Sequence, residues 1–286
     1  MSLFHFFLVL IINLAWGFNF LAAKTALDYF PPFLVLLLRF FLLFIILIPF
    51  LKIPKSKIID ISVLAFISSV MYFSLNFIGL KLAGELTSPA IATQLFIPIG
   101  AILAFIFLSE KVNFKTFFSI LIAFLGVMIL SFDETVFDNI ESLILISISS
   151  IPMAITTILM RKLKGVNTFQ IQAWTGLIAI FPYIFLTLIF EKNQWNLLLA
   201  APIEPVLSIV YSVIAASLIG HGLLYFLLSR YQVSIVNPLL LMSPVFASAF
   251  GVFFREDSLS ILLIVGGSMT LFGVLLISIG SKNKSV

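Results

Sequence analysis

Ten long apolar runs, separated by short polar segments, make up most of the chain. Each run is about 20 residues long, which suits a hydrocarbon core of about 30 Å at a helical rise of about 1.5 Å per residue. A spanning strand needs only about 10 residues with strict alternation, and these runs are unbroken, so the pattern predicts helices. The predicted spans cover residues 4–23, 33–51, 58–80, 87–108, 114–130, 141–160, 168–190, 206–228, 234–254 and 258–279.

The composition excludes the soluble classes of protein. Hydrophobic residues make up 62% of the chain and charged residues 10%, whereas a soluble globular domain carries about 25% charged residues. A water-soluble enzyme, a disordered chain and a nucleic-acid-binding module are therefore excluded. The absence of cysteine removes disulfides, thiolate metal sites and cysteine nucleophiles. Without a Walker loop, ATP hydrolysis by this chain is not expected.

Lysine and arginine are concentrated on one side of the predicted bundle. With ten spans both termini share one side, and that side carries eleven cations against four on the other. Positive charge accumulates in cytoplasmic loops, so both termini are predicted to be cytoplasmic. The eleven are Lys52, Lys55, Lys57, Lys111, Lys115, Arg161, Lys162, Lys164, Arg230, Lys282 and Lys284, and the four are Lys24, Lys81, Lys192 and Arg255.

The two halves of the chain repeat each other. Four residues of the fourth and fifth runs recur in the ninth and tenth, with equal spacings up to the glutamate and one extra residue before the glycine. Five spans per half is an odd number, so the second half enters the membrane from the opposite side, as in many transporters. We predict one repeat in residues 1–132, an inverted one in residues 140–280 and a tail in residues 281–286. The recurring pairs are Ser88 and Ser234, Pro98 and Pro244, Glu110 and Glu256, and Gly126 and Gly273.

Several segments resemble the drug/metabolite transporter superfamily, and specifically its EamA family. They read WGFNFLAAK, FPPFLVLLLRF, FLSEK and AFLGVMIL in the first half and ASLIGHGLLYFLLSRY in the second. The likeness covers nearly the whole chain and is closest to bacterial exporters of the O-acetylserine/cysteine type. It implies an all-α integral membrane fold of ten helices and a central cavity lined by helices 1, 3, 4, 6, 8 and 9. It also implies a place in the bacterial inner membrane.

Arg39 is the one lysine or arginine that lies well inside a predicted span, away from its ends. It sits about seven residues into the second span, roughly 10 Å below the outer interface at a rise of about 1.5 Å per residue. It either snorkels and caps carbonyls of a neighbouring helix, or forms a fork that binds a substrate carboxylate or phosphate. Lys24, at the outer end of the first span, is predicted to anchor the chain at the interface.

The other intramembrane polar residues form short stripes. Intramembrane polar groups usually face protein or a water-filled cavity, so these stripes either line the cavity or hold neighbouring helices together. We predict that they bind substrate together with Arg39. The predicted substrate-binding residues are Trp16, Asn19, Arg39, Tyr72, Asn76, Gln94, His221 and Tyr225.

Pro98 and its repeat mate Pro244 each remove one backbone hydrogen bond and free the carbonyl four residues earlier. Loosened helices at matching places in two halves mark a moving or binding region, so both are predicted hinges, with a static kink as the alternative. Glycines of the tenth span, among them Gly267 and Gly273, are predicted to allow close packing, within the chain or in a homodimer.

No Asp or Glu falls at the middle of a predicted span, and His221 is the only central group that titrates near neutral pH. The sequence therefore favours facilitated export, exchange or weak proton coupling through His221. It predicts no metal site, cofactor, catalytic residue or nucleic-acid partner; the partners are the bilayer and a small molecule.

We expect a secondary transporter that moves a small polar metabolite, an amino acid or derivative, by export. Three alternatives stay open: a nucleotide or nucleoside carrier of the same superfamily, an intramembrane enzyme, and a membrane sensor that transports nothing. The enzyme would need acids, His or Lys clustered at one interface, and the acid clusters of this chain lie in predicted outer loops.

Overall fold

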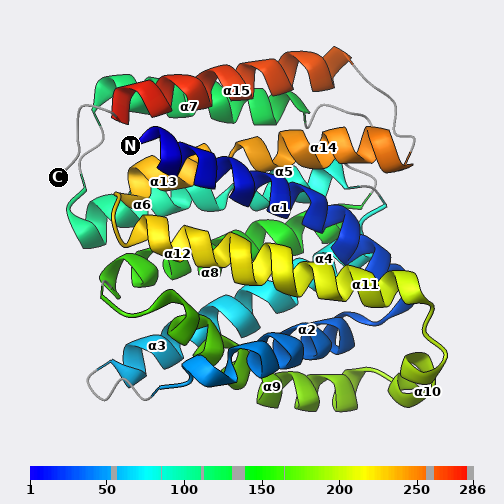
Figure 1. Cartoon of the computed structure of the whole chain (residues 1–286). Coiled ribbons are helices and arrows are strands. Elements are labelled where there is room, and N and C mark those ends of the chain that lie inside the picture. The colour runs from blue at the N-terminus through cyan, green and yellow to red at the C-terminus, as the bar shows by residue number, and fades with distance from the viewer. Residues whose placement is uncertain are drawn as a thin grey trace.

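The computed structural model describes residues 1–52, 57–84, 86–110, 113–130, 139–163, 165–255 and 261–281, and every regular element within them is helical (Figure 1). The helices are α1 (Leu3–Tyr29), α2 (Pro32–Leu47), η1 (Ile48–Phe50), α3 (Ile58–Ala65), η2 (Phe66–Tyr72), α4 (Phe73–Leu82), α5 (Thr87–Thr93), α6 (Phe96–Leu108), α7 (Phe114–Leu130), α8 (Ile140–Lys162), α9 (Thr168–Phe190), α10 (Gln194–Leu199), α11 (Ile203–Tyr211), η4 (Ser212–His221), α12 (Gly222–Leu228), α13 (Val233–Leu239), α14 (Met242–Arg255) and α15 (Ile261–Ser281).

Eight helical stretches of the described chain are long and apolar enough to cross a membrane. Two shorter apolar stretches, residues 117–129 of α7 and 264–277 of α15, fall in the other two predicted spans. The first helix is longer than predicted and continues through Lys24 to Tyr29, which gives it 27 residues and a length of about 40 Å. The all-helical prediction is confirmed for the described residues.

The bundle is apolar outside and partly polar inside. Large apolar side chains are exposed on its outer surface, for example Phe105 (65%), Phe185 (64%) and Phe253 (80%). Asn13 and Thr157, in contrast, are fully buried between helices. Water would not favour this distribution, but a bilayer does, because lipid replaces water as the solvent of the outer surface.

Four inner helical passes are irregular, at matching positions. The third pass is π-helical over Phe66–Tyr72 and the eighth over Ser212–His221. The fourth pass is broken between α5 and α6, and the ninth between α13 and α14. The sequence suggested unbroken spans here, with loosening at Pro98 and Pro244.

Both breaks have the same hydrogen-bond pattern. The carbonyl of Gln94, which Pro98 leaves without its usual partner, accepts from the N–H of Ile97 at 3.0 Å. The carbonyl of Leu240 accepts from the N–H of Ser243 at the same distance. Each proline therefore tightens one turn instead of leaving a carbonyl unpaired in the bilayer. Whether these turns act as hinges stays a prediction.

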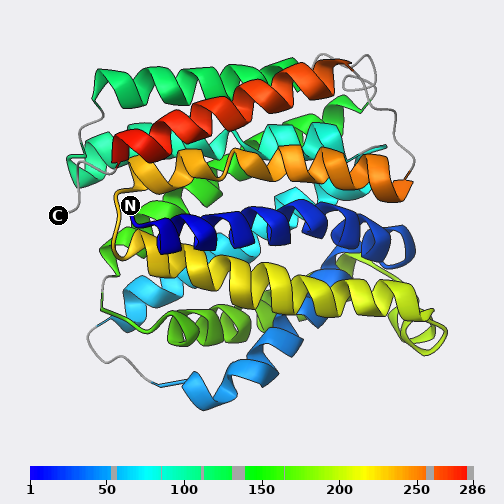
Figure 2. The same ribbon diagram turned by 45° about the horizontal axis from the view of Figure 1, so that its top comes forward.

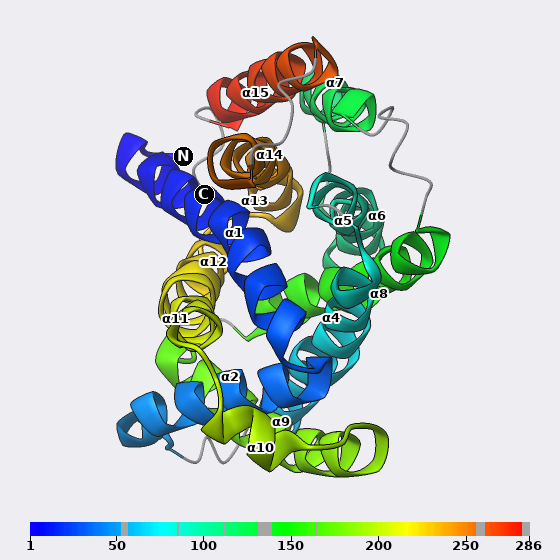
Figure 3. The ribbon, with the colours of Figure 1, turned by 90° about the vertical axis from the view of Figure 1, so that its right-hand side faces the viewer.

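The helices pair in a pattern that is unchanged when those of residues 1–130 are exchanged for those of residues 139–281. Figure 3 shows α7 beside α15 at one end of the molecule and α2 beside α9 at the other. Between them α1 packs on α14, as α8 does on α6, and α4 packs on α8, as α11 and η4 do on α1. The helix pair α7 and α15 forms an outer layer over the rest (Figure 2).

Glycines allow these helices to approach closely. A Cβ built at Gly126 would lie 2.5 Å from the backbone nitrogen of Thr270, and one at Gly273 would lie 2.5 Å from that of Ala123. The two contacts are reciprocal, because each glycine faces a residue that lies three positions before the other glycine. Gly273 therefore packs within the chain.

Two carboxylates outside the helices cap helix N-termini. Glu191 accepts from the backbone N–H groups of Phe33 (2.6 Å) and Leu34 (2.9 Å) at the start of α2, and from the Thr187 hydroxyl (2.6 Å). Partial burial raises the pKa of the Glu191 carboxyl above its ordinary value, and these hydrogen bonds oppose that rise. Glu110 makes the equivalent contacts at the start of α13.

The glycine contact can be tested with Gly273→Ala. The new methyl group meets the backbone of Ala123, which has little room to move, so we expect a loss of about 1–3 kcal/mol and a lower melting temperature in detergent. Gly267→Ala is the matched control on the same helix, because its Cβ meets only Val245 Cγ1 at 3.5 Å. Equal melting temperatures for the two variants would contradict the packing role.

Candidate functional site

One pocket lies in the middle of the bundle, with an empty volume of about 620 Å³ that includes space open to solvent. Its lining comes from α1, α2, η2, α4, α5, α6, α8, η4 and α14 and from the two breaks. It extends towards the C-terminal ends of α1 and α4, where Ala23 and Leu80 line it. Seven of the eight predicted substrate-binding residues line it together: Trp16, Asn19, Arg39, Tyr72, Asn76, Gln94 and His221.

The irregular parts of the backbone lie at this pocket. Tyr72 ends one π-helical segment and His221 ends the other, while Gln94 and Leu240 sit in the two breaks. Non-helical backbone at membrane depth is tolerated only where it is buried in protein or lines a cavity. π-Helical turns likewise occur mostly at functional sites. The backbone thus marks the same place as the side chains.

Arg39 supplies a buried cation to the pocket. It is 1% exposed, and its Nε and Nη2 donate to Ser217 Oγ at 3.0 and 2.8 Å. The guanidinium carbon lies 4.5 Å from the ring centre of Phe73. Among the described residues no carboxylate lies within 4.0 Å of Arg39, and its Nη1 has no hydrogen-bond partner. The side chain does not snorkel to an interface; it keeps a donor available at the pocket.

Trp16 and His221 share one acceptor, on the same helical segment as Ser217. Trp16 Nε1 donates to the carbonyl of Ala216 at 3.1 Å, and His221 Nδ1 lies 2.9 Å from the same oxygen. Because a carbonyl can only accept, Nδ1 carries the proton, and in the neutral form of the ring Nε2 is an acceptor. The two rings are 4.9 Å apart. Gly220 makes this contact possible, because a Cβ there would lie 2.4 Å from the indole nitrogen.

The pocket also holds acceptors without a donor. Gln94 Nε2 donates to the carbonyl of Ala90 at 3.1 Å, while its Oε1 has no partner. Asn19 Oδ1 is likewise buried and unpaired, as is Ser243 Oγ, whose hydroxyl can donate or accept. Asn76 Nδ2 is 3.5 Å from Thr93 Oγ1, so these two stabilise one another. A buried polar atom without a partner is costly, and a ligand is one reason to keep it.

Tyr225 and the two prolines do not line the pocket among the described residues. Tyr225 is buried, with its ring centre 6.4 Å from that of His221. Pro98 and Pro244 lie one turn beyond the breaks. Ser243 and Phe73 do line the pocket, although sequence reasoning missed both. Ser243 is the repeat mate of the apolar Ile97, so the repeat carried no polar signal, and Phe73 is one of 33 phenylalanines.

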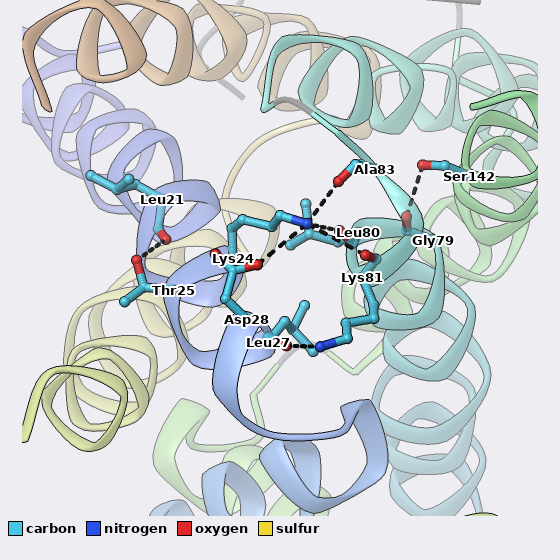
Figure 4. Close-up of polar contacts among 10 residues, drawn as sticks. All are labelled: Leu21, Lys24, Thr25, Leu27, Asp28, Gly79, Leu80, Lys81, Ala83 and Ser142. Carbon is cyan, nitrogen blue, oxygen red and sulfur yellow. Dashed lines mark hydrogen bonds and ion pairs between the residues drawn. The ribbon is translucent and has the colours of Figure 1, made fainter. Parts of the chain in front are cut away.

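Two lysines join α1 and α4 at the end towards which the pocket extends (Figure 4). Lys24 Nζ donates to three carbonyls at the end of α4, the shortest bond being 2.7 Å to Ala83, and lies 3.5 Å from Asp28. Lys81 donates to the carbonyl of Leu27 in the last turn of α1. Each lysine therefore compensates the negative end of the other helix. Lys24 is buried and braces two helices, and its role as an anchor at the interface stays a prediction.

Comparison with known proteins identifies the family. The model of a family described as the EamA-like transporter family matches residues 3–132 and again residues 141–279. The chain belongs to the EamA-like transporter family. A Salmonella typhimurium relative named "Probable amino-acid metabolite efflux pump" is 26% identical over 278 residues, or 94% of this chain and 92% of that protein. The Escherichia coli protein of the same name is 26% identical over 277 residues.

More distant similarity extends the comparison. An Archaeoglobus fulgidus protein named "Uncharacterized transporter" is 26% identical over 276 residues, covering 92% of this chain and 94% of that protein. A solved crystal structure superimposes with a TM-score of 0.79 over 99% of both chains at 16% sequence identity, which shows a shared fold. The family, the relatives' names and the apolar helices indicate that this EamA-family chain is a multi-pass membrane transporter. Within its described residues, no group of three or more His, Asp or Glu can hold a metal ion.

The hydrogen bonds that hold Arg39 in this EamA-family pocket can be tested with Ser217→Ala. Two guanidinium donors lose their acceptor in a buried place, so we expect a loss of about 1–3 kcal/mol and a lower melting temperature in detergent. Ser229→Ala is the control, because its hydroxyl donates to Phe226 O at 2.7 Å, an acceptor three residues away. A loss no larger than that of the control would contradict the anchoring of Arg39 by Ser217.

Proposed function

We propose that the chain is a secondary transporter with ten spans in two inverted halves, residues 1–132 and 140–280, working by alternating access. Three observations support the duplication. The family model matches the chain twice, the helix pairing is unchanged when the halves are exchanged, and both halves have a π-helical pass followed by a broken one. Inverted halves can exchange conformations at little net cost, which turns an outward-open state into an inward-open one.

The proposed orientation places both ends of the chain in the cytoplasm of a bacterial cell. The excess of Lys and Arg on one side supports it. So does the course of the chain, because α1 begins and α15 ends on the same side of the bundle (Figure 1). In this orientation the pocket extends towards the outer face through Ala23 and Leu80, which supports an outward-facing state as the proposed state of this structure.

The proposed cargo is an amino acid or a close derivative. The observation that carries this proposal is the buried guanidinium of Arg39, which lines the pocket without a carboxylate among the described residues. A cargo carboxylate would compensate that charge and bind Nη1. An amino group would find acceptors in Asn19 Oδ1 and Gln94 Oε1, and a short apolar side chain would lie against residues such as Phe20 and Met153. Both bacterial relatives carry names of amino-acid metabolite pumps, which supports export.

His221 is proposed to act as a neutral hydrogen-bonding group. Its Nδ1 is bonded to a carbonyl, the rings of Trp16 and Phe73 lie against it, and no described carboxylate is within 4.0 Å. A proton carrier in a membrane usually has an acidic partner. The proposed transport is therefore facilitated export or exchange.

The cargo site is tested by counterflow of radiolabelled amino acids and derivatives into proteoliposomes. We expect saturable counterflow for at least one, and a loss of affinity on the order of tenfold to a hundredfold in Arg39→Gln, because a charge-assisted bond is lost. The affinity of the Arg39→Lys variant should lie between those of the unchanged protein and of Arg39→Gln, because lysine keeps the charge but not the forked guanidinium. Counterflow with nucleoside monophosphates only, or an unchanged affinity in Arg39→Gln, would contradict the assignment.

The role of His221 is tested by the dependence of flux on pH. If the ring works as a neutral group, His221→Gln keeps the shape of the flux profile between about pH 6 and 8. The profile should be recorded with an imposed pH gradient and with equal pH on both sides. A gradient-driven flux that disappears in His221→Gln would show proton coupling through this residue.

A further inference from the structure

The side-chain carboxylate of Glu110 forms a cluster of hydrogen bonds at the end of the bundle remote from the pocket. Glu110 follows the last residue of α6 by two positions and is 5% exposed. Its Oε1 accepts from the backbone N–H of Val233 at 3.0 Å. Its Oε2 accepts from the N–H of Ser234 at 3.0 Å and from the Ser234 hydroxyl at 2.8 Å. One carboxylate thereby takes three hydrogen bonds from the first turn of α13.

The local backbone turns Glu110 towards α13. Ser109 has a positive φ of 53°, in the left-handed region, and reverses the chain at the end of α6. The N–H of Glu110 then bonds to the carbonyl of Ala104 at 3.2 Å, which closes the turn. Only a few non-glycine residues adopt such a φ, so this turn is a specific feature.

Arg161 extends the contact to two further passes. Its Nε lies 3.9 Å from Glu110 Oε1, and its Nη1 donates to the carbonyl of Leu228 at 3.0 Å. Arg161 belongs to α8 and Leu228 ends α12. The pair therefore joins the ends of the fourth, sixth, eighth and ninth passes, each of which contributes lining to the pocket through residues such as Met153 and His221.

We propose that Glu110 is the latch of the cytoplasmic gate, holding α6 against α13 in this state and releasing Val233 and Ser234 when the pocket opens inward. The proposal rests on the alternating access proposed above. Helix α6 packs on α13, and parting these helices at Glu110 requires all three hydrogen bonds to break. The repeat carries the matching residues Ser88 and Glu256, but the Ser88 side chain and Glu256 lie outside the described residues.

The chain also offers a matched control for a carboxylate that only caps a helix. Glu191 accepts two backbone N–H bonds and one hydroxyl bond, as Glu110 does. It joins α9 to α2, which pack along each other and lie at the edge of the bundle. Loss of the two carboxylates should therefore cost similar stability but affect the gate differently.

The test uses the natural absence of cysteine. A single reporter, Ser243→Cys, is placed in the pocket, and its labelling by a membrane-impermeant maleimide is compared in right-side-out and inverted vesicles. Glu110→Gln should raise cytoplasmic relative to outer labelling roughly tenfold, because the isosteric amide loses the charge and one acceptor. Ser234→Ala should shift the ratio in the same direction but less, since it removes one of three bonds. Glu191→Gln should leave the ratio unchanged.

An unchanged ratio in Glu110→Gln and Ser234→Ala would overturn the latch and leave Glu110 as a cap. If Glu110→Gln does not accumulate, Ser234→Ala decides the same question. A further variant with Glu110→Cys and Ser234→Cys is joined by a reducible crosslinker. It should stop counterflow until the crosslinker is cleaved, whereas counterflow at the uncrosslinked rate would also overturn the proposal.

Labelling needs no cargo, so the two proposals fail separately. A shifted labelling ratio without counterflow of any amino acid would contradict the proposed cargo and keep the latch. Counterflow with a fixed ratio would contradict the latch and keep the carrier.

Discussion

Inside a bilayer every backbone N–H and C=O must find its partner within the protein, and this constraint shapes the molecule. It explains why every regular element of the described chain is helical, and it bears on the π-helical and broken segments of four inner stretches. At Gln94 and Leu240 the carbonyls freed by Pro98 and Pro244 are paired again in tightened turns. Such turns have fewer regular hydrogen bonds to lose than a continuous helix, so a change of angle there costs less. The pocket lies at these two breaks.

The second feature is the buried charge of Arg39, which has no carboxylate within 4.0 Å among the described residues. Burying a guanidinium is expensive, and a carboxylate partner is the usual compensation. Here Ser217 and the face of Phe73 hold Arg39 in place, and neither neutralises it. An incoming anion gains the most binding free energy when the guanidinium is held rigidly and its charge is not already compensated. A built-in carboxylate would stabilise the fold more and compete with the cargo.

The two capping carboxylates show how position changes the consequence of one chemistry. Glu191 and Glu110 each accept two backbone N–H groups from the first turn of another helix and one hydroxyl, which comes from Thr187 of α9 for Glu191 and from Ser234 of α13 for Glu110. The first joins two helices at the edge of the bundle, which have no need to separate. The second joins two helices below the pocket, on opposite sides of the proposed route. A hydrogen-bonded cap acts as a latch only where function requires its helices to part.

The sequence by itself determined the helical class, the ten apolar runs and the repeat, because span length, polarity and residue spacing are local properties of the chain. It also indicated seven pocket residues, since a polar side chain in a long apolar run faces either the protein interior or a cavity. Tertiary structure alone decided that Arg39 binds Ser217, that Lys24 caps α4, and that Glu110 reaches α13. These depend on backbone acceptors and donors, which every residue possesses and no sequence pattern distinguishes, and on side chains brought together from distant helices.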